Sequence, residues 1–172
     1  MVPARPLTTA RRIGFPPVVD ERSRVLILGS LPGDASLKAA QYYAHPQNGF
    51  WRLIGAVIAQ PDLAARPYEA RLERLRAARI GLWDVIASAE RQGSLDAAIR
   101  NPENADLTAL TARLPDLRAV AFNGGTAARL GRRALAGASG VALLDLPSSS
   151  AAHARPFAEK LSRWTALGPY LG

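Results

Sequence analysis

The stretch RVLILGS, residues 24–30, is an almost unbroken apolar run that ends in Gly-Ser. Three later stretches have the same character, namely GLWDVI (81–86), RAVAFNG (118–124) and VALLDLP (141–147). Short apolar runs bounded by turn residues are typical of strands that are buried on both faces of a parallel sheet. The sequence therefore predicts four buried parallel strands.

Between and after these runs, apolar residues recur at the spacing of amphipathic helices. They are Phe50, Leu53, Ile54 and Val57 in the first segment, Leu72 and Leu75 in an arginine-rich second segment at about 67–79, and Phe157, Leu161 and Trp164 in the third. Strands that alternate with helices predict an α/β protein with a layered α/β/α architecture. No repeat or change of composition marks a boundary, so we expect one domain over residues 1–172, with residues 1–12 as a loose basic arm.

The composition narrows the classes of partner and cofactor. The 172-residue chain has 22 basic and 14 acidic residues, a net charge of +8, and its only lysines are Lys38 and Lys160. Such a charge favours a polyanionic partner, although an alanine- and arginine-rich composition alone would also produce it. The absence of cysteine excludes disulfides, thiolate nucleophiles and cysteine-ligated metal centres. No apolar run approaches the ~18 residues of a membrane span, so we expect a cytoplasmic protein without membrane contact.

Several familiar catalytic motifs are absent or incomplete. GSLPGDAS (29–36) lacks the lysine of a phosphate-binding loop, which argues against a nucleotide triphosphatase. The turn NGGT (123–126) could hold a phosphate at a helix start, but such turns are as often structural. His45 and His153 have no carboxylate at metal-ligand spacing, so we expect no metal and no other cofactor. A serine nucleophile among residues 148–150 lacks the G-x-S-x-G context.

The segment QYYAHPQNGFW, residues 41–51, holds four aromatic side chains although only 6% of the chain is aromatic. Phe50 and Trp51 begin a helical pattern, and we expect them to face the core. Its other candidate residues precede that helix in a loop at the mouth of the sheet, where packing has less need of them. These are Tyr42, Tyr43, His45 and Asn48. Aromatic faces and an amide are suited to holding a nucleobase that has left its duplex.

The motifs GSLPG, YYAHPQNGFW, GLWDV, FNGG and LPSSSAAHA follow one another between residues 29 and 154. In order and spacing they resemble the hypoxanthine-DNA glycosylase branch of the uracil-DNA glycosylase superfamily, over about residues 13–167. The resemblance implies a three-layer α/β/α fold with a four-stranded parallel sheet. It also implies a pocket for a flipped base at the carboxyl edge of that sheet and hydrolysis of an N-glycosidic bond in DNA.

The resemblance assigns roles to particular residues. Asn48 matches the asparagine to which this branch assigns catalysis, and Tyr43 matches the ring that stacks on the extruded base. Other branches carry an Asp, Asn or Glu in the first motif to orient water. This chain instead has Ser30 and Leu31 after Gly29, which fits the hypoxanthine branch, and we take these three residues as part of the base pocket.

The closing serine-rich loop resembles the segment that enters the duplex as the base leaves. It runs from Ser148 through Ser149 and Ser150 to His153. Ser148 stands where relatives place His or Asn, and Ala151 stands where the family commonly has proline. The resemblance therefore assigns a DNA-binding role to this loop. With alanine in place of proline at position 151, we expect the loop to be less rigid than in the family.

Two assignments stay open at this point. Either His45 or His153 could stabilise the departing base, and either Asp84 or Asn123, each at the end of a predicted strand, could contact the base edge. Neither lysine lies in a matched motif, so we expect a monofunctional enzyme that acts as a monomer on DNA containing deaminated bases. The alternatives are a catalytically silent DNA-binding module of the same fold and an α/β enzyme that acts on free nucleotides.

Overall fold

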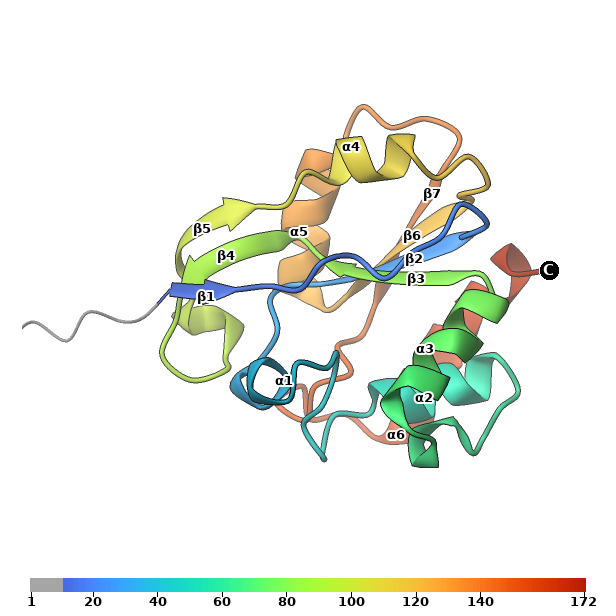
Figure 1. Cartoon of the computed structure of the whole chain (residues 1–172), viewed down its shortest axis with the longest axis horizontal. Helices are drawn as coiled ribbons and strands as arrows, with labels where there is room; N and C mark the ends of the chain where they lie inside the picture. Colours follow the sequence, from blue (N-terminus) through green and yellow to red (C-terminus); the bar gives the residue numbers. More distant parts are fainter. Residues whose placement is uncertain (1–10) are drawn as a thin grey trace, which may run out of the picture.

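The computed structural model describes residues 11–172 and shows a parallel sheet between two layers of helices (Figure 1). The strand order is β3-β2-β6-β7, with β2 at Val25–Gly29, β3 at Ile80–Asp84, β6 at Ala119–Asn123 and β7 at Ala142–Leu146. Each neighbouring pair in this sheet is parallel. The four predicted strands and the predicted α/β/α class are therefore confirmed.

The side chains of β2 explain why the sheet is covered on both faces. Val25 and Ile27 belong to one hydrophobic core, whereas Leu26 and Leu28 belong to another, and all four are fully buried. Successive residues of a strand point to opposite faces of the sheet. An entirely apolar strand therefore requires a helical layer on each side.

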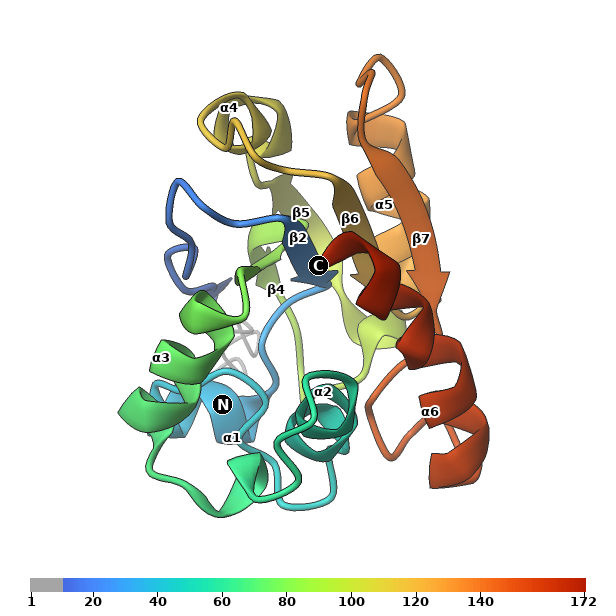
Figure 2. The ribbon, with the colours of Figure 1, turned by 90° about the vertical axis from the view of Figure 1, so that its right-hand side faces the viewer.

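The helices divide between the two faces of the sheet (Figure 2). One core receives side chains from α2 (Phe50–Val57), α3 (Tyr68–Ala77) and α6 (Phe157–Trp164), and the other from α4 (Leu107–Ala112) and α5 (Gly125–Ala134). The three helices expected from apolar spacing are α2, α3 and α6, and all three are present. Further short helical segments are α1 (Asp34–Ala39), η1 (Leu63–Ala65), η2 (Asp96–Ala98) and η3 (Thr165–Tyr170).

A second, antiparallel sheet was not expected from the sequence. It has the order β1-β4-β5, with β1 at Arg11–Ile13, β4 at Ile86–Glu90 and β5 at Arg100–Asn104. Arg11 and Arg12, which the sequence placed in a loose arm, pair with β4 instead. Residues 1–10 of that expected arm lie outside the described part of the chain.

The run at residues 81–86 was expected to form one strand, and this expectation was wrong at its end. β3 stops at Asp84, and the chain then enters the second sheet at Ile86. Val85 connects the two sheets, and its N–H donates to the Gly29 carbonyl at 2.8 Å. The change of sheet thus occurs beside the carboxyl end of β2.

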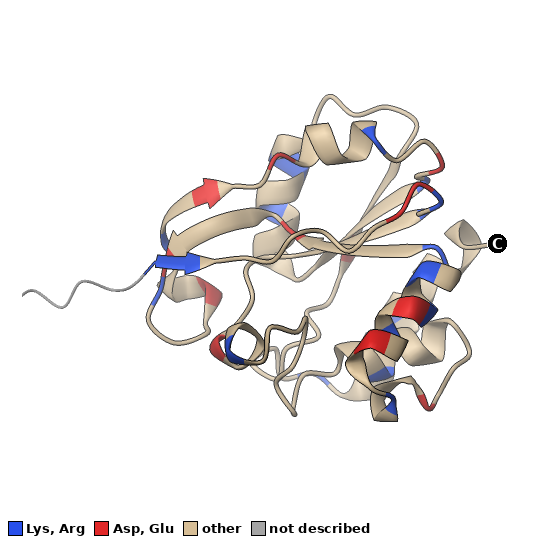
Figure 3. Cartoon of the chain, in the orientation of Figure 1, with Lys and Arg blue, Asp and Glu red and all other residues tan. Residues whose placement is uncertain are grey.

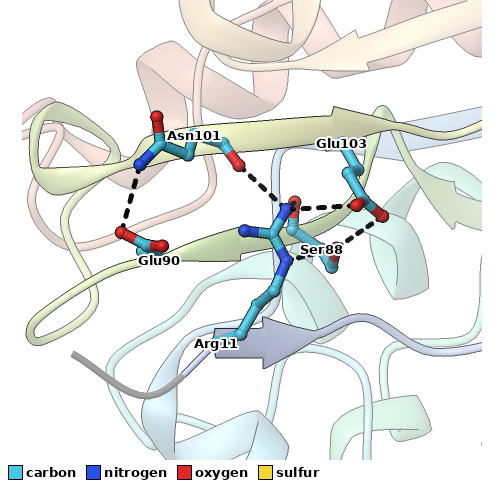
Figure 4. Close-up of polar contacts among 5 residues, drawn as sticks. All are labelled: Arg11, Ser88, Glu90, Asn101 and Glu103. Carbon is cyan, nitrogen blue, oxygen red and sulfur yellow. Dashed lines mark hydrogen bonds and ion pairs between the residues drawn. The ribbon is translucent and has the colours of Figure 1, made fainter. Parts of the chain in front are cut away.

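Contacts of the Arg11 side chain tie the three strands of the second sheet together (Figure 4). Nε of Arg11 donates to Ser88 Oγ at 3.0 Å, and Nη2 donates to the Asn101 carbonyl at 2.9 Å. Ser88 also donates to Glu103 at 3.1 Å, and the Asn101 amide donates to Glu90 at 3.2 Å. All five residues of β5 are exposed, so polar contacts rather than an apolar face fix its position.

Loops from both sheets meet at one edge of the molecule. The segments that follow β2, β6 and β7 leave the parallel sheet at its carboxyl edge, where α/β proteins bind ligands. The connection between β4 and β5 reaches the same region beside α1 (Figure 1), because Ser94 Oγ accepts the Asp34 N–H at 2.9 Å. Among residues 11–172, no helix has the length and apolar character needed to cross a membrane.

Candidate active site

A cavity of about 520 Å³ opens at the carboxyl edge of the parallel sheet. This volume lies within the roughly 300–1,000 Å³ of small-molecule sites. The cavity collects the site residues that the sequence selected. They are Gly29, Ser30, Leu31, Tyr43, His45, Asn48, Asp84, Asn123, Ser148, Ser149, Ser150 and His153. Segments that lie far apart in the sequence therefore converge on one site.

Asn48 is held in one orientation at the start of α2. Its Oδ1 accepts the Phe50 N–H at 3.0 Å, and its own backbone N–H donates to the His45 carbonyl at 2.9 Å. An N–H donor identifies its acceptor as the amide oxygen, so the contact fixes which side of the carboxamide is which. The oxygen retains a second lone pair, and Nδ2 has no hydrogen-bond partner among the described residues.

The ring of Tyr43 is packed against the core on one side. It stacks on Phe50 with ring centroids 4.0 Å apart and an angle of 20° between the planes. The backbone of Tyr43 has a φ of 54°, a left-handed conformation that costs a non-glycine residue roughly 1–2 kcal/mol. Burial, followed by the nearby Asp84 carboxyl, raises the pKa of the Tyr43 hydroxyl, so the side chain is a neutral phenol.

Tyr42 belongs to the core, which corrects the expectation that packing has little need of it. It is buried, its hydroxyl donates to the Pro16 carbonyl at 3.1 Å, and its own carbonyl accepts Trp51 Nε1–H at 3.1 Å. Phe50 and Trp51 are buried in the same core, as expected. Tyr42 also lines the cavity, but it is almost completely buried, so the half-buried Tyr43 is the candidate stacking surface.

Asp84 ends β3 at the floor of the cavity and is 4% exposed. Its Oδ2 is buried and has no hydrogen-bond partner among the described residues. Burial, followed by the charge of Asp96, raises the pKa of Asp84 to about 7 against the opposing charge of Arg91. A carboxyl that is both buried and unpartnered is a strong candidate for ligand contact.

Gly29 makes this position of Asp84 possible. A Cβ at residue 29 would lie 2.6 Å from Oδ1 of Asp84 and 3.0 Å from the Tyr43 hydroxyl. Both distances are shorter than ordinary van der Waals contacts, so a larger residue would displace the carboxyl. Glycine is thus needed here for close approach rather than for an unusual φ.

Asn123 ends β6, and its amide holds the serine-rich loop. Oδ1 accepts the Ser149 N–H at 2.8 Å, and Nδ2 donates to Ser149 Oγ at 2.9 Å. The sequence left open whether Asp84 or Asn123 contacts the base edge. Asp84 is the better candidate, because its Oδ2 has no partner among the described residues, whereas Asn123 already uses one N–H and one lone pair of its amide to hold the serine-rich loop.

Further contacts fix the loop at residues 148–153. The Ser149 carbonyl accepts the Gly49 N–H at 2.9 Å, and the Ser150 carbonyl accepts a hydrogen bond from Lys160 Nζ at 3.0 Å. Lys160 is buried on α6, and burial lowers the pKa of its amine. His45 and His153 are both exposed at the cavity, so their side chains are accessible from solvent.

The sequence did not reveal one rim of the cavity, formed by Ser94, Leu95 and Asp96. Ser30 Oγ donates to Asp96 Oδ1 at 2.6 Å, which joins this rim to the end of β2. No motif marks these residues, because they lie in the connection between β4 and β5. Among residues 11–172, no group of three or more His, Cys, Asp or Glu residues could hold a metal ion.

The cavity lies at the carboxyl edge of the parallel sheet, where α/β proteins bind ligands. It combines an aromatic ring with an oriented amide and an unpartnered buried carboxyl, which is typical of a small-molecule binding site. The family model of the Uracil DNA glycosylase superfamily matches residues 16–168. The chain belongs to this superfamily.

Individual relatives agree with the family assignment. Two proteins named Hypoxanthine DNA glycosylase, from Methanosarcina barkeri and Methanosarcina acetivorans, are each 42% identical over 154 residues, covering 90% of this chain and 96% of theirs. A solution NMR structure from Methanosarcina acetivorans, provisionally described as a uracil DNA glycosylase, superposes with a TM-score of 0.84 at 41% identity. That match covers 94% of this chain and 99% of the solved one.

Proposed function

We propose that this chain is a monofunctional DNA glycosylase of base-excision repair that removes deaminated bases, with hypoxanthine as the first candidate and uracil as the second. The observation that carries the proposal is the cavity that brings Asn48, Tyr43 and the unpartnered oxygen of Asp84 together. The similarity to proteins named Hypoxanthine DNA glycosylase supports the choice of substrate. A complete cavity within one chain supports action as a monomer, and we propose the cytoplasm as its compartment.

The reaction requires a positioned water and a stabilised leaving group. As the N-glycosidic bond breaks, positive charge develops on the sugar and negative charge on the base. The second lone pair of Asn48 Oδ1 accepts a hydrogen bond from the water whose oxygen attacks C1′ of the sugar. The water gives its oxygen and one hydrogen to C1′ and releases its other proton to solvent, while the departing base takes up one proton, so that the products are a free base and an abasic site. His45 or His153 stabilises the base as it leaves, since both line the cavity.

Asp84 accounts for discrimination between hypoxanthine and adenine. Hypoxanthine presents an N1–H donor beside its O6 acceptor, and uracil presents the equivalent N3–H beside O4. An ionised Asp84 accepts that N–H through Oδ2. Adenine has a lone pair at N1, which an ionised carboxylate would repel. Tyr43 supplies the face on which the base stacks, through the side of its ring that does not contact Phe50.

Phosphate contacts come from elements that flank the cavity. Basic residues lie on several elements with acidic residues among them (Figure 3), so net charge alone does not define a DNA-binding face. Lys38 on α1, Arg52 on α2 and Arg155 beyond the serine-rich loop are exposed and belong to segments around the opening. Together with the loop at residues 148–153, these are the proposed contacts to the DNA backbone.

A product assay tests the proposal directly. The chain is incubated with oligonucleotides that contain hypoxanthine, uracil, xanthine or only normal bases, and abasic sites are then revealed by alkaline cleavage. We expect cleavage at hypoxanthine, weaker or comparable cleavage at uracil, and none at adenine. Tight binding without abasic sites would instead support a catalytically silent DNA-binding module. Release of base from free nucleotides but not from DNA would support the nucleotide-directed alternative.

A further inference from the structure

Leu95 is a large apolar side chain at the rim of the cavity that remains 61% exposed. Among the described residues, the other large apolar side chain with comparable exposure is Ile13, at 72%, which does not line the cavity. A single exposed leucine is ordinary on a protein surface and needs no explanation by itself. The backbone around Leu95 and the composition of the facing rim give it significance.

The backbone on both sides of Leu95 is held by hydrogen bonds. Ser94 Oγ accepts the Asp34 N–H of α1 at 2.9 Å, and Asp96 Oδ1 accepts the Ser30 hydroxyl at 2.6 Å. The residues directly before and after the leucine are therefore joined to the segment that follows β2. Leu95 projects from a fixed position at the opening.

Hydrogen bonds from the buried side chain of Arg91 also hold the backbone of this rim. The Arg91 side chain is 1% exposed, its Nε donates to the Gly93 carbonyl at 2.8 Å, and its Nη2 donates to the Pro32 carbonyl. Burial of an arginine costs side-chain entropy and desolvation, so such a contact is expected where a loop must keep its conformation. The rim at residues 91–96 is thus preorganised and presents an apolar tip.

The facing rim has no comparable side chain. Residues 148–153 are three serines, two alanines and a histidine. Proteins that unstack DNA commonly insert Phe, Leu, Ile, Met or Pro between bases, since an apolar wedge replaces the lost stacking contacts. Leu31 also lines the cavity, but it is buried and cannot reach a duplex outside it. Leu95 is the exposed aliphatic side chain that the cavity rim offers for this task.

We propose that Leu95 is a positioning residue that enters the base stack when the target nucleotide leaves it. The inference rests on the proposed function, since it requires a base to be extruded from duplex DNA. The leucine does not touch the reacting atoms. Leu95 instead affects the equilibrium between the stacked and the extruded nucleotide. Extrusion costs energy in a duplex but little in a single strand. The proposal therefore predicts a defect that depends on the form of the DNA.

The test compares wild type, Leu95→Ala, Leu95→Met and Ile13→Ala in single-turnover excision of hypoxanthine. Ile13→Ala is the matched control, because it truncates a similarly exposed apolar residue away from the cavity. We expect Leu95→Ala to slow excision from a duplex at least about tenfold while changing excision from a single strand by less than about twofold. Leu95→Met should restore most of the duplex rate, and Ile13→Ala should match wild type on both substrates.

A second readout follows extrusion itself. A 2-aminopurine placed next to hypoxanthine in the duplex becomes more fluorescent when its neighbour unstacks, and Leu95→Ala should reduce this rise. Equal losses on duplex and single strand, or an unchanged duplex rate and fluorescence, would overturn the wedge while leaving the glycosylase assignment intact. A wild-type protein that releases no base from either DNA would overturn the proposed function and the wedge with it.

Discussion

The rate of base excision by wild type should fall at acidic pH, and this acidic limb of the pH profile should be absent when Asp84 is replaced by Asn. The pKa of Asp84 is raised to about 7 by burial and by Asp96, against the influence of Arg91, and Tyr43 is a neutral group beside it. If the ionised carboxylate accepts the N–H of the base, activity follows the ionised fraction. For a pKa of about 7, that fraction is roughly a tenth at pH 6 and nine-tenths at pH 8. The rate of wild type should then rise about ninefold to tenfold over this range.

The same ionisation affects stability in the opposite direction. The carboxyl holds its proton more tightly in the folded state than at the ordinary value of 3.8, so the folded state is favoured at low pH. This contribution is lost as pH rises from about 4 through about 7. In total it corresponds to about 4 kcal/mol, of which more than half falls between pH 5 and pH 8. The stability of Asp84→Asn relative to wild type should therefore increase by that share of the total between the two pH values.

Two measurements check this reasoning. Single-turnover excision of hypoxanthine between pH 5.5 and 8.5 should show the acidic limb in wild type and not in Asp84→Asn, and urea unfolding at pH 5 and pH 8 should show the stability trend. Asp96→Asn is a matched control, because removal of its negative charge should lower the midpoint of the limb without abolishing it. An unchanged limb in Asp84→Asn, or a stability difference that is equal at both pH values, would show that Asp84 does not titrate as described.

Four other outcomes are expected. Asn48→Ala should lower the excision rate at least ~10²-fold with little change in DNA affinity, because its role is in the transition state; near-normal turnover of a folded variant would refute this. Tyr43→Phe should be tolerated and Tyr43→Ala should not, since the ring stacks on Phe50 and the hydroxyl has no hydrogen-bond partner among the described residues; equal losses would point to the hydroxyl. Affinity for undamaged duplex should fall with salt at a log–log slope of about −3 or steeper, and a flat plot would argue against arginine–phosphate contacts. Borohydride should trap no covalent adduct with DNA, and an adduct that disappears in Lys160→Arg would identify the buried amine as a nucleophile.

Apolar patterning was sufficient to predict the central layers of the fold. The strands β2, β3, β6 and β7 are apolar runs, and a fully buried strand such as β2 admits few other structures. The rule that ligands bind at the carboxyl edge of a parallel sheet then placed the motif residues at one site. The cavity contains all of them, although their individual roles remain predictions.

The second sheet was not predictable in this way. β5 reads RNPEN, with every residue exposed, and β1 has only three residues, so neither shows the alternation of a half-buried strand. Its stability depends on contacts such as those of Arg11, which a linear pattern does not reveal. Consequently the rim that carries Leu95 was missed. The choice between Asp84 and Asn123 also required the hydrogen-bond partners of each side chain.

Arg91 explains why the second sheet matters for the site. It directly follows β4, which places its guanidinium beneath the cavity rim, where it contacts the carbonyls of Pro32 and Gly93. Its positive charge also counteracts the rise in the pKa of Asp84. One side chain therefore supports the loop that presents Leu95 and favours the ionised form of the carboxyl on the cavity floor. The Nη1 of Arg91 is buried without a partner among the described residues, and an unsatisfied buried donor lowers the free energy of unfolding. Such departures from local stability rules concentrate at functional sites, and here the left-handed Tyr43, the unpartnered Asp84 and the buried Arg91 all lie in or beside one cavity.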